Sequence, residues 1–198
     1  VAEDGLSGEV VGELVHVREP HVTLIQGLTK GSKMEFVIEK CVEVGVEAVW
    51  PVRFERSLAR YDDERAAHKG ERWRRIAEAA AKQSGRTFVP LVADPAQADG
   101  LISRLAAFDA VLVPWEEAVG APGVGQALEA AGVDRGGRVA IVVGPEGGLS
   151  ETEIAAFEGA GAVTVTLGDT ILRTETAGIL SVALCVYELG GLGGRSRG

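Results

Sequence analysis

The sequence predicts a mostly parallel α/β fold, and three observations support that class. Residues 138–143 form, after Arg138, an unbroken apolar run, which is typical of a parallel strand buried on both faces. Other short β-prone runs alternate with segments of helical periodicity along the chain. The chain has 198 residues, of which 46% are hydrophobic and 25% are charged, so it can bury a sizeable core without disulfides or metals.

The first half of the chain begins with β-prone segments and continues with two helices. Short apolar runs within residues 9–25 predict two or three strands. Apolar residues recur at helical spacing over residues 33–44, and Gly45 is a suitable stop for that helix. Residues 48–52 predict a strand, and residues 64–83, rich in alanine and arginine, predict a long helix.

The second half continues the alternation of strands and helices. We expect strands at residues 110–113, 138–143 and 162–167, and helices at residues 124–131, 151–159 and 175–189. Ser150 and Glu153 have the spacing of a capping box, with Leu149 and Ile154 placed for a hydrophobic staple. Thr174 is expected to cap the last helix. That helix is apolar nearly all round, so we expect it to be buried within its subunit or in a subunit interface.

Charge is distributed unevenly along the chain. The net charge is −9, yet residues 53–86 carry 10 basic and 6 acidic side chains. A local basic face can contact phosphates although the whole molecule is acidic. The alternative is a solvated helical face, and charge alone does not choose between them.

Several function classes are disfavoured. No apolar run approaches the roughly 20 residues that span a bilayer, and the acidic start lacks the pattern of a signal peptide. We therefore expect a cytoplasmic protein with no membrane contact. Cys41 and Cys185 are expected to be reduced, buried thiols. His16, His21 and His68 do not cluster in the sequence, so no metal is expected.

Two glycine-containing loops are the candidate ligand sites. Residues 144–148 (Gly-Pro-Glu-Gly-Gly) join a predicted strand to a predicted helix. Adjacent glycines permit close approach of a ligand to the backbone, although such a turn can also serve packing alone. Residues 167–177 repeat this layout, and two such loops at the carboxyl ends of neighbouring strands would form a crevice. Arg173 and Glu175 would lie at its mouth, unless they only pair with each other or cap the helix. The glycines at 120, 123 and 125 are interpreted as an ordinary loop.

These motifs, with others in the same order, resemble one known family. The matching segments are Gly144–Gly148, Leu167-Gly168, residues 171–177 (Ile-Leu-Arg-Thr-Glu-Thr-Ala), 30–35, 43–46, 55–57, 72–76, 83–86 with Pro90, and 116–117. Together they are similar to the RsmE family of 16S ribosomal RNA (uracil-N3)-methyltransferases, in the SPOUT superfamily. The resemblance covers about residues 25–189.

The resemblance implies a SPOUT-type, mostly parallel sheet with a C-terminal trefoil knot, a homodimer, and S-adenosylmethionine bound in the knot crevice. The 16S RNA of the small ribosomal subunit would be the substrate. By motif match, the cofactor contacts would be Val143, Gly144, Pro145, Glu146, Gly147, Gly148, Leu167, Gly168, Ile171, Leu172, Arg173 and Ala177, with Leu112 and Val113 as a further wall.

The resemblance also implies a division of the chain. Residues 1–26 would be the remnant of an N-terminal PUA-like β-domain, residues 27–190 the methyltransferase domain, and residues 191–198 a flexible tail. The family's N-terminal domain is usually complete, and this chain enters it late, so we expect weakened RNA affinity.

Methylation of uracil N3 needs an acceptor for the N3 proton and a group that stabilises the resulting anion. We expect Arg173 to stabilise the anion and Glu175 to be the candidate base. Phosphate contacts are predicted for Arg53, Arg56, Lys82 and Arg86. Three alternatives remain open at this point: a related methyltransferase acting on a ribose hydroxyl, a non-catalytic RNA-binding or ribosome-assembly factor, and a binding protein for another nucleotide.

Overall fold

A computed structural model describes residues 20–59 and 63–192. Its centre is one sheet whose strands are β1 (His21–Gly27), β2 (Ala48–Arg53), β3 (Leu91–Val92), β4 (Ala96–Gln97), β5 (Ala110–Pro114), β6 (Arg138–Val143) and β7 (Val163–Val165). The strand order is β3-β2-β1-β6-β5-β7, with β4 also paired to β2. Each of these pairings is parallel, as the sequence predicts.

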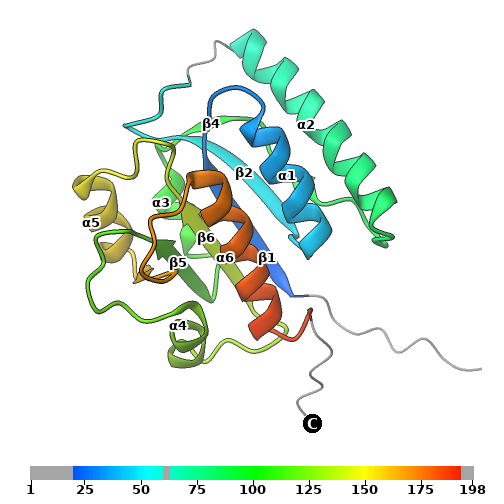
Figure 1. Ribbon diagram of the computed structural model, residues 1–198. Helices are drawn as coiled ribbons and strands as arrows, with labels where there is room; N and C mark the ends of the chain where they lie inside the picture. Colours follow the sequence, from blue (N-terminus) through cyan, green and yellow to red (C-terminus); the bar gives the residue numbers. More distant parts are fainter. Residues whose placement is uncertain (1–19, 60–62, 193–198) are drawn as a thin grey trace, which may run out of the picture.

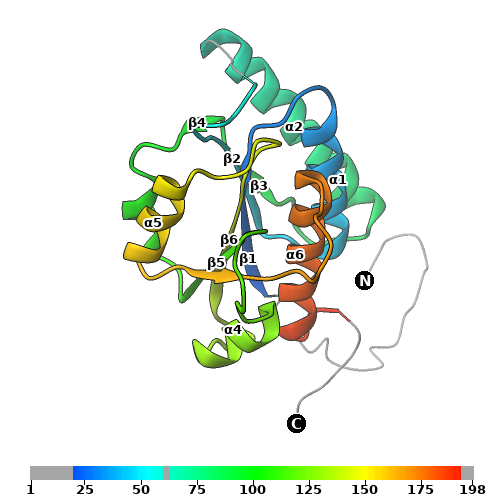
Figure 2. The same ribbon diagram turned by 60° about the vertical axis from the view of Figure 1, so that its left-hand side comes forward.

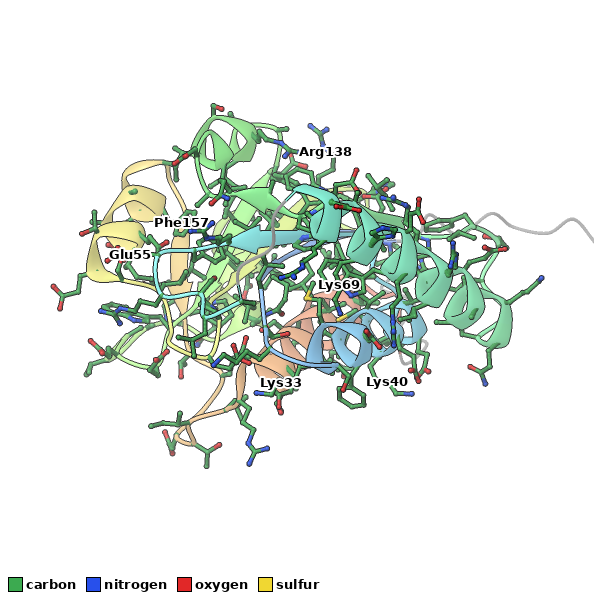
Figure 3. All side chains as sticks on the ribbon, turned by 90° about the horizontal axis from the view of Figure 1, so that it is seen from above. Lys33, Lys40, Glu55, Lys69, Arg138 and Phe157 are labelled. Carbon is green, nitrogen blue, oxygen red and sulfur yellow. The ribbon has the colours of Figure 1, made fainter. Side chains whose placement is uncertain are left out.

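Within the described residues, six helices cover the sheet. They are α1 (Lys33–Val44), α2 (Asp63–Gln83), α3 (Leu101–Leu105), α4 (Val124–Ala130), α5 (Glu151–Gly159) and α6 (Thr174–Glu188). Helices α1 and α6 pack side by side on one face, with α2 outside α1 (Figure 1). Helix α5 lies on the opposite face (Figure 2). Figure 3 shows the same division, with Lys33 and Lys40 along α1 and Phe157 on the other side of the sheet.

Side chains alternate between two cores because successive residues of a strand point to opposite faces. Along β6, Val139, Ile141 and Val143 enter the core beneath α1 and α6, whereas Ala140 and Val142 enter the core beneath α3 and α5. Strands β1 and β5 show the same alternation. A strand with two apolar faces reads as an unbroken apolar run, which is why β6 could be predicted from sequence.

Most predicted elements are confirmed within a residue or two. Helix α1 has the predicted bounds, and Gly45 ends it in the left-handed region at φ 110°. Both hydrogen bonds of the capping box at α5 form between Ser150 and Glu153. Three short elements, β3, β4 and α3, were not predicted because they are too short to show a periodic pattern.

Two predictions need correction. The predicted domain boundary at residue 26 is wrong, because residues 21–27 form β1, which pairs with β2 and β6 in the middle of the main sheet. Predictions for residues 1–19, and for most of the predicted tail, fall outside the described residues. Thr174 is not the cap of α6: Arg173 occupies the N-cap position without a side-chain cap, and the Thr174 hydroxyl bonds elsewhere.

Candidate active site

The two predicted glycine loops meet at the carboxyl ends of the strands. The first follows β6 over residues 144–150, and the second runs over residues 166–173 from β7 to α6. Thr174 Oγ1 donates a hydrogen bond to the carbonyl oxygen of Gly144 at 2.5 Å. It also accepts one at 2.9 Å from Nε2 of Gln26, a fully buried residue of β1. The central strand therefore holds both loops through a single threonine.

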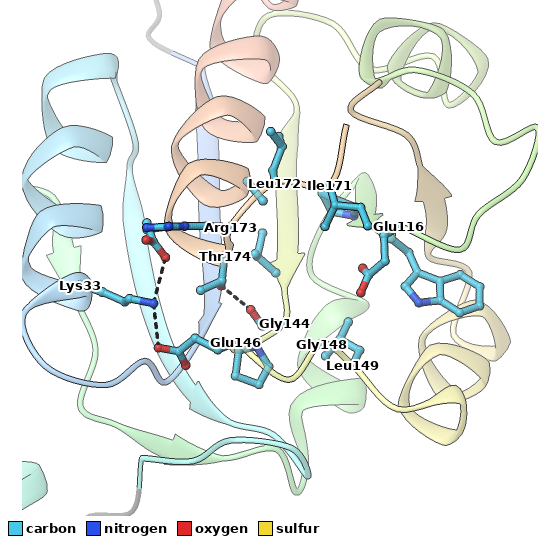
Figure 4. Close-up of a pocket in the computed structure, with 16 residues that line it drawn as sticks. Lys33, Glu116, Gly144, Glu146, Gly148, Leu149, Ile171, Leu172, Arg173 and Thr174 are labelled. Carbon is cyan, nitrogen blue, oxygen red and sulfur yellow. Dashed lines mark hydrogen bonds and ion pairs between the residues drawn. The ribbon is translucent and has the colours of Figure 1, made fainter. Parts of the chain in front are cut away.

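A pocket of two adjoining lobes opens between these loops. Figure 4 shows the residues that line the larger lobe. The larger lobe has a volume of about 360 Å³ and contains the ionisable side chains of Lys33, Glu116, Glu146, Arg173 and Glu175. The smaller lobe, about 100 Å³, is lined mainly by residues 166–172. Both lobes are bounded by residues 114–116, at the carboxyl end of β5, and by Ile171, Leu172 and Ala177.

Lys33, the first residue of α1, lies between two carboxylates of the larger lobe. Its Nζ is 3.2 Å from Glu146 Oε1 and 3.5 Å from Glu175 Oε2 (Figure 4). Burial works to raise the pKa of Glu146, but hydrogen bonds from the backbone amides of Lys30 and of Glu146 itself, together with the Lys33 ammonium, hold this pKa below its ordinary value. Oε2 of Glu175 is buried and accepts no hydrogen bond from the described residues. The site thus keeps two carboxylates close to one ammonium.

Arg173 and Glu116 occupy the open part of the pocket. Neither side chain has a hydrogen bond or ion pair with another described residue, and both are exposed. Ile171, at the rim, is 86% exposed. An unpaired guanidinium, an unpaired carboxylate and an exposed apolar side chain leave these walls available for contact with ligands.

The structure brings most of the predicted site residues together. The pocket walls include the following predicted residues: Val143, Gly144, Pro145, Glu146, Gly148, Leu167, Gly168, Ile171, Leu172, Arg173, Glu175 and Ala177. Three predicted residues do not line it. Leu112 and Val113 point into the two cores, so the wall at β5 is formed by the residues that follow them. Gly147 faces Arg56 instead, and a Cβ there would lie 3.1 Å from the Arg56 Cβ.

Several pocket residues were not predicted from the sequence, and they are Lys33, Pro114, Trp115, Glu116, Leu149, Thr166, Asp169, Thr170 and Thr174. Lys33 and Glu116 each lay within a motif that carried the family resemblance, but nothing in the spacing placed either one beside the glycine loops. Their position depends on which strands are neighbours, because β1 and β5 flank β6 in the sheet.

The four predicted RNA contacts lie in two separate places. Arg53 and Arg56 follow the carboxyl end of β2, and Arg56 Nη1 donates to the Leu149 carbonyl at 3.3 Å, close to the pocket. Lys82 and Arg86 lie at the far end of α2, whose 21 residues span about 30 Å. Nη1 of Arg86 donates to the carbonyls of Val46 and Val42 at 2.5 and 3.3 Å, around the C-terminal end of α1. The four predicted contacts therefore do not form one continuous surface.

Neither a candidate metal-binding group nor a membrane-spanning helix is present among the described residues. Among the described residues, no group of three or more His, Cys, Asp or Glu side chains is arranged to hold a metal ion. In the same part of the chain, every helix is too short or too polar to cross a bilayer. Burial raises the pKa of Cys185 to about 12 and that of Cys41 well above its usual value, so neither thiol offers a ready nucleophile.

Comparisons with known proteins agree with this geometry. Residues 17–186 match the sequence model of the RNA methyltransferase domain family. The chain is 39% identical to the ribosomal RNA small subunit methyltransferase E of Bacillus subtilis over 84% of its own length and 66% of that protein's.

Two solved structures are similar as well. One is a ribosomal RNA small subunit methyltransferase E from Neisseria gonorrhoeae bound to S-adenosyl methionine (34% identity, TM-score 0.71, 83% of this chain and 65% of that one). The other is a putative methyltransferase from Legionella pneumophila in complex with the same cofactor (30% identity, TM-score 0.75, 84% and 66%). In each case this chain spans slightly less than two thirds of its relative.

Proposed function

Because this chain belongs to the RsmE family of RNA methyltransferases, we propose that it transfers a methyl group from S-adenosylmethionine to N3 of a uridine in the 16S RNA of the small ribosomal subunit. One observation carries the proposal. The loops after β6 and β7, which hold the family motifs, converge on a single two-lobed pocket with ionisable groups at one end.

The residues present fit this cofactor. The larger lobe alone falls within the range of about 300–1,000 Å³ that is usual for small-molecule sites. Its walls combine apolar side chains with backbone of the two loops, and Gly148, in the left-handed region at φ 71°, adds no side chain. Val143, Gly144 and Gly148 from one loop, with Leu167, Gly168 and Leu172 from the other, would hold it. When bound, it supplies a methyl group on a positively charged sulfur, already electrophilic.

The protein's own chemical task is to manage one proton. Neutral uracil carries a hydrogen on N3, which must leave before N3 can attack. Glu175 is positioned to accept that proton at Oε2, which is buried and free of hydrogen bonds from the described residues. The Lys33 ammonium forms an ion pair with the same oxygen at 3.5 Å, which holds the Glu175 side chain in the pocket.

Arg173 is suited to the other half of that task. Its guanidinium is exposed at the mouth of the pocket without an ion pair to the described residues. It can therefore stabilise negative charge on the uracil oxygens as the proton leaves. Arg56, beside the same mouth, is suited to contact the phosphate of an unpaired or flipped nucleotide.

We extend the proposal to the C-terminal trefoil knot. The segment 166–173 contacts chain on two sides: the Thr166 amide donates to the Pro122 carbonyl, and Thr174 donates to that of Gly144. Helix α6 then packs against β1 and β6, on the face opposite α5. Hydrogen bonds to two earlier loops and the return of the chain on the other face of the sheet are compatible with such a knot.

Homodimerisation and a cytoplasmic location complete the proposal. Phe36 of α1 and Tyr187 of α6 are 48% and 42% exposed on two helices that pack together. Exposed aromatic side chains on one pair of helices favour a self-association surface. Analytical ultracentrifugation of the wild type and of Phe36→Lys tests homodimerisation alone, and we expect a dimer for the wild type and a weakened dimer for the variant.

The decisive experiment measures methyl transfer. Small subunits isolated from cells lacking this activity are incubated with the protein and S-adenosylmethionine, and the 16S RNA is digested and analysed by mass spectrometry. The proposal expects one 3-methyluridine per subunit. Methylation of a ribose hydroxyl would identify a different RNA specificity, and cofactor binding without any product would favour a non-catalytic role.

A further inference from the structure

Glu116 stands where the two lobes of the pocket join. The residues common to both lobes are Pro114, Trp115, Glu116, Ile171, Leu172 and Ala177. Of these, Glu116 is the one ionisable side chain. We call this junction, formed by the six shared residues, the waist of the pocket. Glu116 is therefore the one carboxylate on the otherwise uncharged walls of the waist.

The carboxylate of Glu116 faces across this waist toward the glycine loop (Figure 4). A Cβ built on Gly148 would lie 3.3 Å from Glu116 Oε1, so a side chain at 148 would crowd the carboxylate. No hydrogen bond or ion pair joins this carboxylate to another residue within the described ranges. Other carboxylates of the larger lobe, Glu146 and Glu175, are already paired with Lys33.

The chemistry of the two lobes indicates which part of a ligand reaches the waist. The smaller lobe is lined largely by uncharged residues of the segment 166–172, which suits a neutral nucleobase. The larger lobe contains Lys33, Glu146, Arg173 and Glu175, which suit charged groups and the reacting base. In a nucleoside ligand that spans both lobes, the ribose joins the two ends and lies between them.

We propose that Glu116 recognises the ribose of the nucleoside cofactor by accepting hydrogen bonds from its hydroxyl groups. A carboxylate is well suited to this role, since an ionised acid accepts hydrogen bonds at both oxygens and is the usual partner of a ribose hydroxyl in dinucleotide sites. The inference rests on the proposed function, because it requires an adenosine-bearing ligand. The inference adds Glu116 to the ligand-binding residues and identifies the ribose hydroxyls as the groups that it binds.

Isothermal titration calorimetry with a double cycle of protein and ligand changes tests the proposal. The probes are S-adenosylmethionine, S-adenosylhomocysteine and the 2′-deoxy and 3′-deoxy forms of S-adenosylhomocysteine. The variants are Glu116→Ala and the closer mimic Glu116→Gln. Glu117→Ala is the matched control, because this substitution removes the same charge from an exposed residue that lines neither lobe. Thermal unfolding of each variant verifies that it is folded.

We expect Glu116→Ala to weaken S-adenosylhomocysteine binding on the order of tenfold or more, the usual effect of losing a hydrogen bond to a charged group. At least one deoxy ligand should bind the wild type more weakly than S-adenosylhomocysteine does. The same deoxy ligand and S-adenosylhomocysteine should bind Glu116→Ala with equal affinity. The affinity of Glu116→Gln for S-adenosylhomocysteine should lie between those of the wild type and Glu116→Ala, and the affinity of Glu117→Ala should equal that of the wild type.

Three results would overturn the inference. If removing a hydroxyl weakens binding equally in the wild type and in Glu116→Ala, the ribose is recognised elsewhere. If Glu116→Ala weakens S-adenosylmethionine but not S-adenosylhomocysteine, the carboxylate serves the positive sulfur instead. If the wild type binds neither parent ligand, both the proposed function and this inference fail, whereas the first two results leave the proposed function intact.

Discussion

The hydroxyl of Thr174 donates a 2.5 Å hydrogen bond to the carbonyl oxygen of Gly144, although 30 residues separate the two in the chain. Through this contact, the first turn of α6 is tied to the loop that follows β6. Gln26 of β1 donates to the same hydroxyl from a fully buried position. Both walls of the pocket are thus fixed to the central strand, which is the preorganisation that a ligand site requires.

Replacing Thr174 with valine removes this connection while preserving shape. We expect the free energy of unfolding to fall by about 1–3 kcal/mol, because the amide of Gln26 and the Gly144 carbonyl lose a buried partner. Affinity for S-adenosylhomocysteine should fall too, since the loops lose their common support. Urea unfolding and calorimetry measure the two effects. Thr176→Val, at an exposed position of the same helix, is the control, and equal behaviour of the two variants would contradict the prediction.

Glu175→Gln tests the proposed base. Removing a positioned general base typically reduces the chemical step by about 10²–10⁴-fold, so single-turnover methylation should slow by that order. Cofactor affinity should change little, because an amide of the same size remains. Glu151→Gln, exposed in the first turn of α5, should retain full rate. A normal rate for Glu175→Gln would assign the proton to another acceptor.

The lowered pKa of Glu146 predicts a specific pH dependence. Its ordinary value is 4.5, and the folded protein holds it lower. Glu146 therefore contributes stability that is fully present above pH 4.5 and is lost as the pH falls through the folded pKa, since the unfolded chain takes up the proton first. The difference in unfolding free energy between the wild type and Glu146→Gln should be constant near neutrality and shrink in acid. A difference that stays constant below pH 4.5 would contradict this assignment.

Arg86→Ala should act first on stability. Its guanidinium bonds to the carbonyls of Val42 and Val46 and lies 4.4 Å from the centre of the Phe88 ring. Losing hydrogen bonds from a charged group costs about 1.5–3 kcal/mol, which thermal unfolding will detect. Lys82→Ala, at an exposed nearby position, should leave stability unchanged. If either residue contacts a phosphate, its variant should also flatten the salt dependence of RNA binding; an unchanged slope for Arg86→Ala would leave it a structural residue only.

Gly27→Ala should displace the loop that follows β6, because Gly27 lies against the backbone of that loop. A Cβ at Gly27 would lie 2.3 Å from the backbone nitrogen of Pro145 and 2.7 Å from the carbonyl carbon of Gly144. Backbone atoms must shift to relieve this overlap, so we expect a loss of about 1–3 kcal/mol in stability together with weaker cofactor binding. Gly159→Ala, at the end of α5 with open space around its Cβ, should be neutral or stabilising by up to about 1 kcal/mol. Similar losses in both variants would show that the close approach at Gly27 is not responsible.

Much of the fold could be predicted because its signals are local. The apolar run of β6, the period of α1 with Gly45 after it, and the capping box at Ser150 each depend on residues close in sequence. The short strands β3 and β4 depend on the neighbouring β2, and could not be predicted because two residues show no period. The boundary at residue 26 failed for the same reason: only pairing with β2 and β6 reveals that β1 belongs to the main sheet.

By itself the sequence determined the parallel α/β class and the two glycine loops, because strand burial, helix ends and loop composition each depend on residues that are adjacent in the chain. It also carried the family motifs from which the cofactor site was expected. Only the tertiary structure decided that Lys33 stands between Glu146 and Glu175, that Glu116 faces Gly148, and that Arg86 supports the end of α1. Those relationships follow from which strands are neighbours and where their carboxyl ends meet, and sequence spacing does not contain that information.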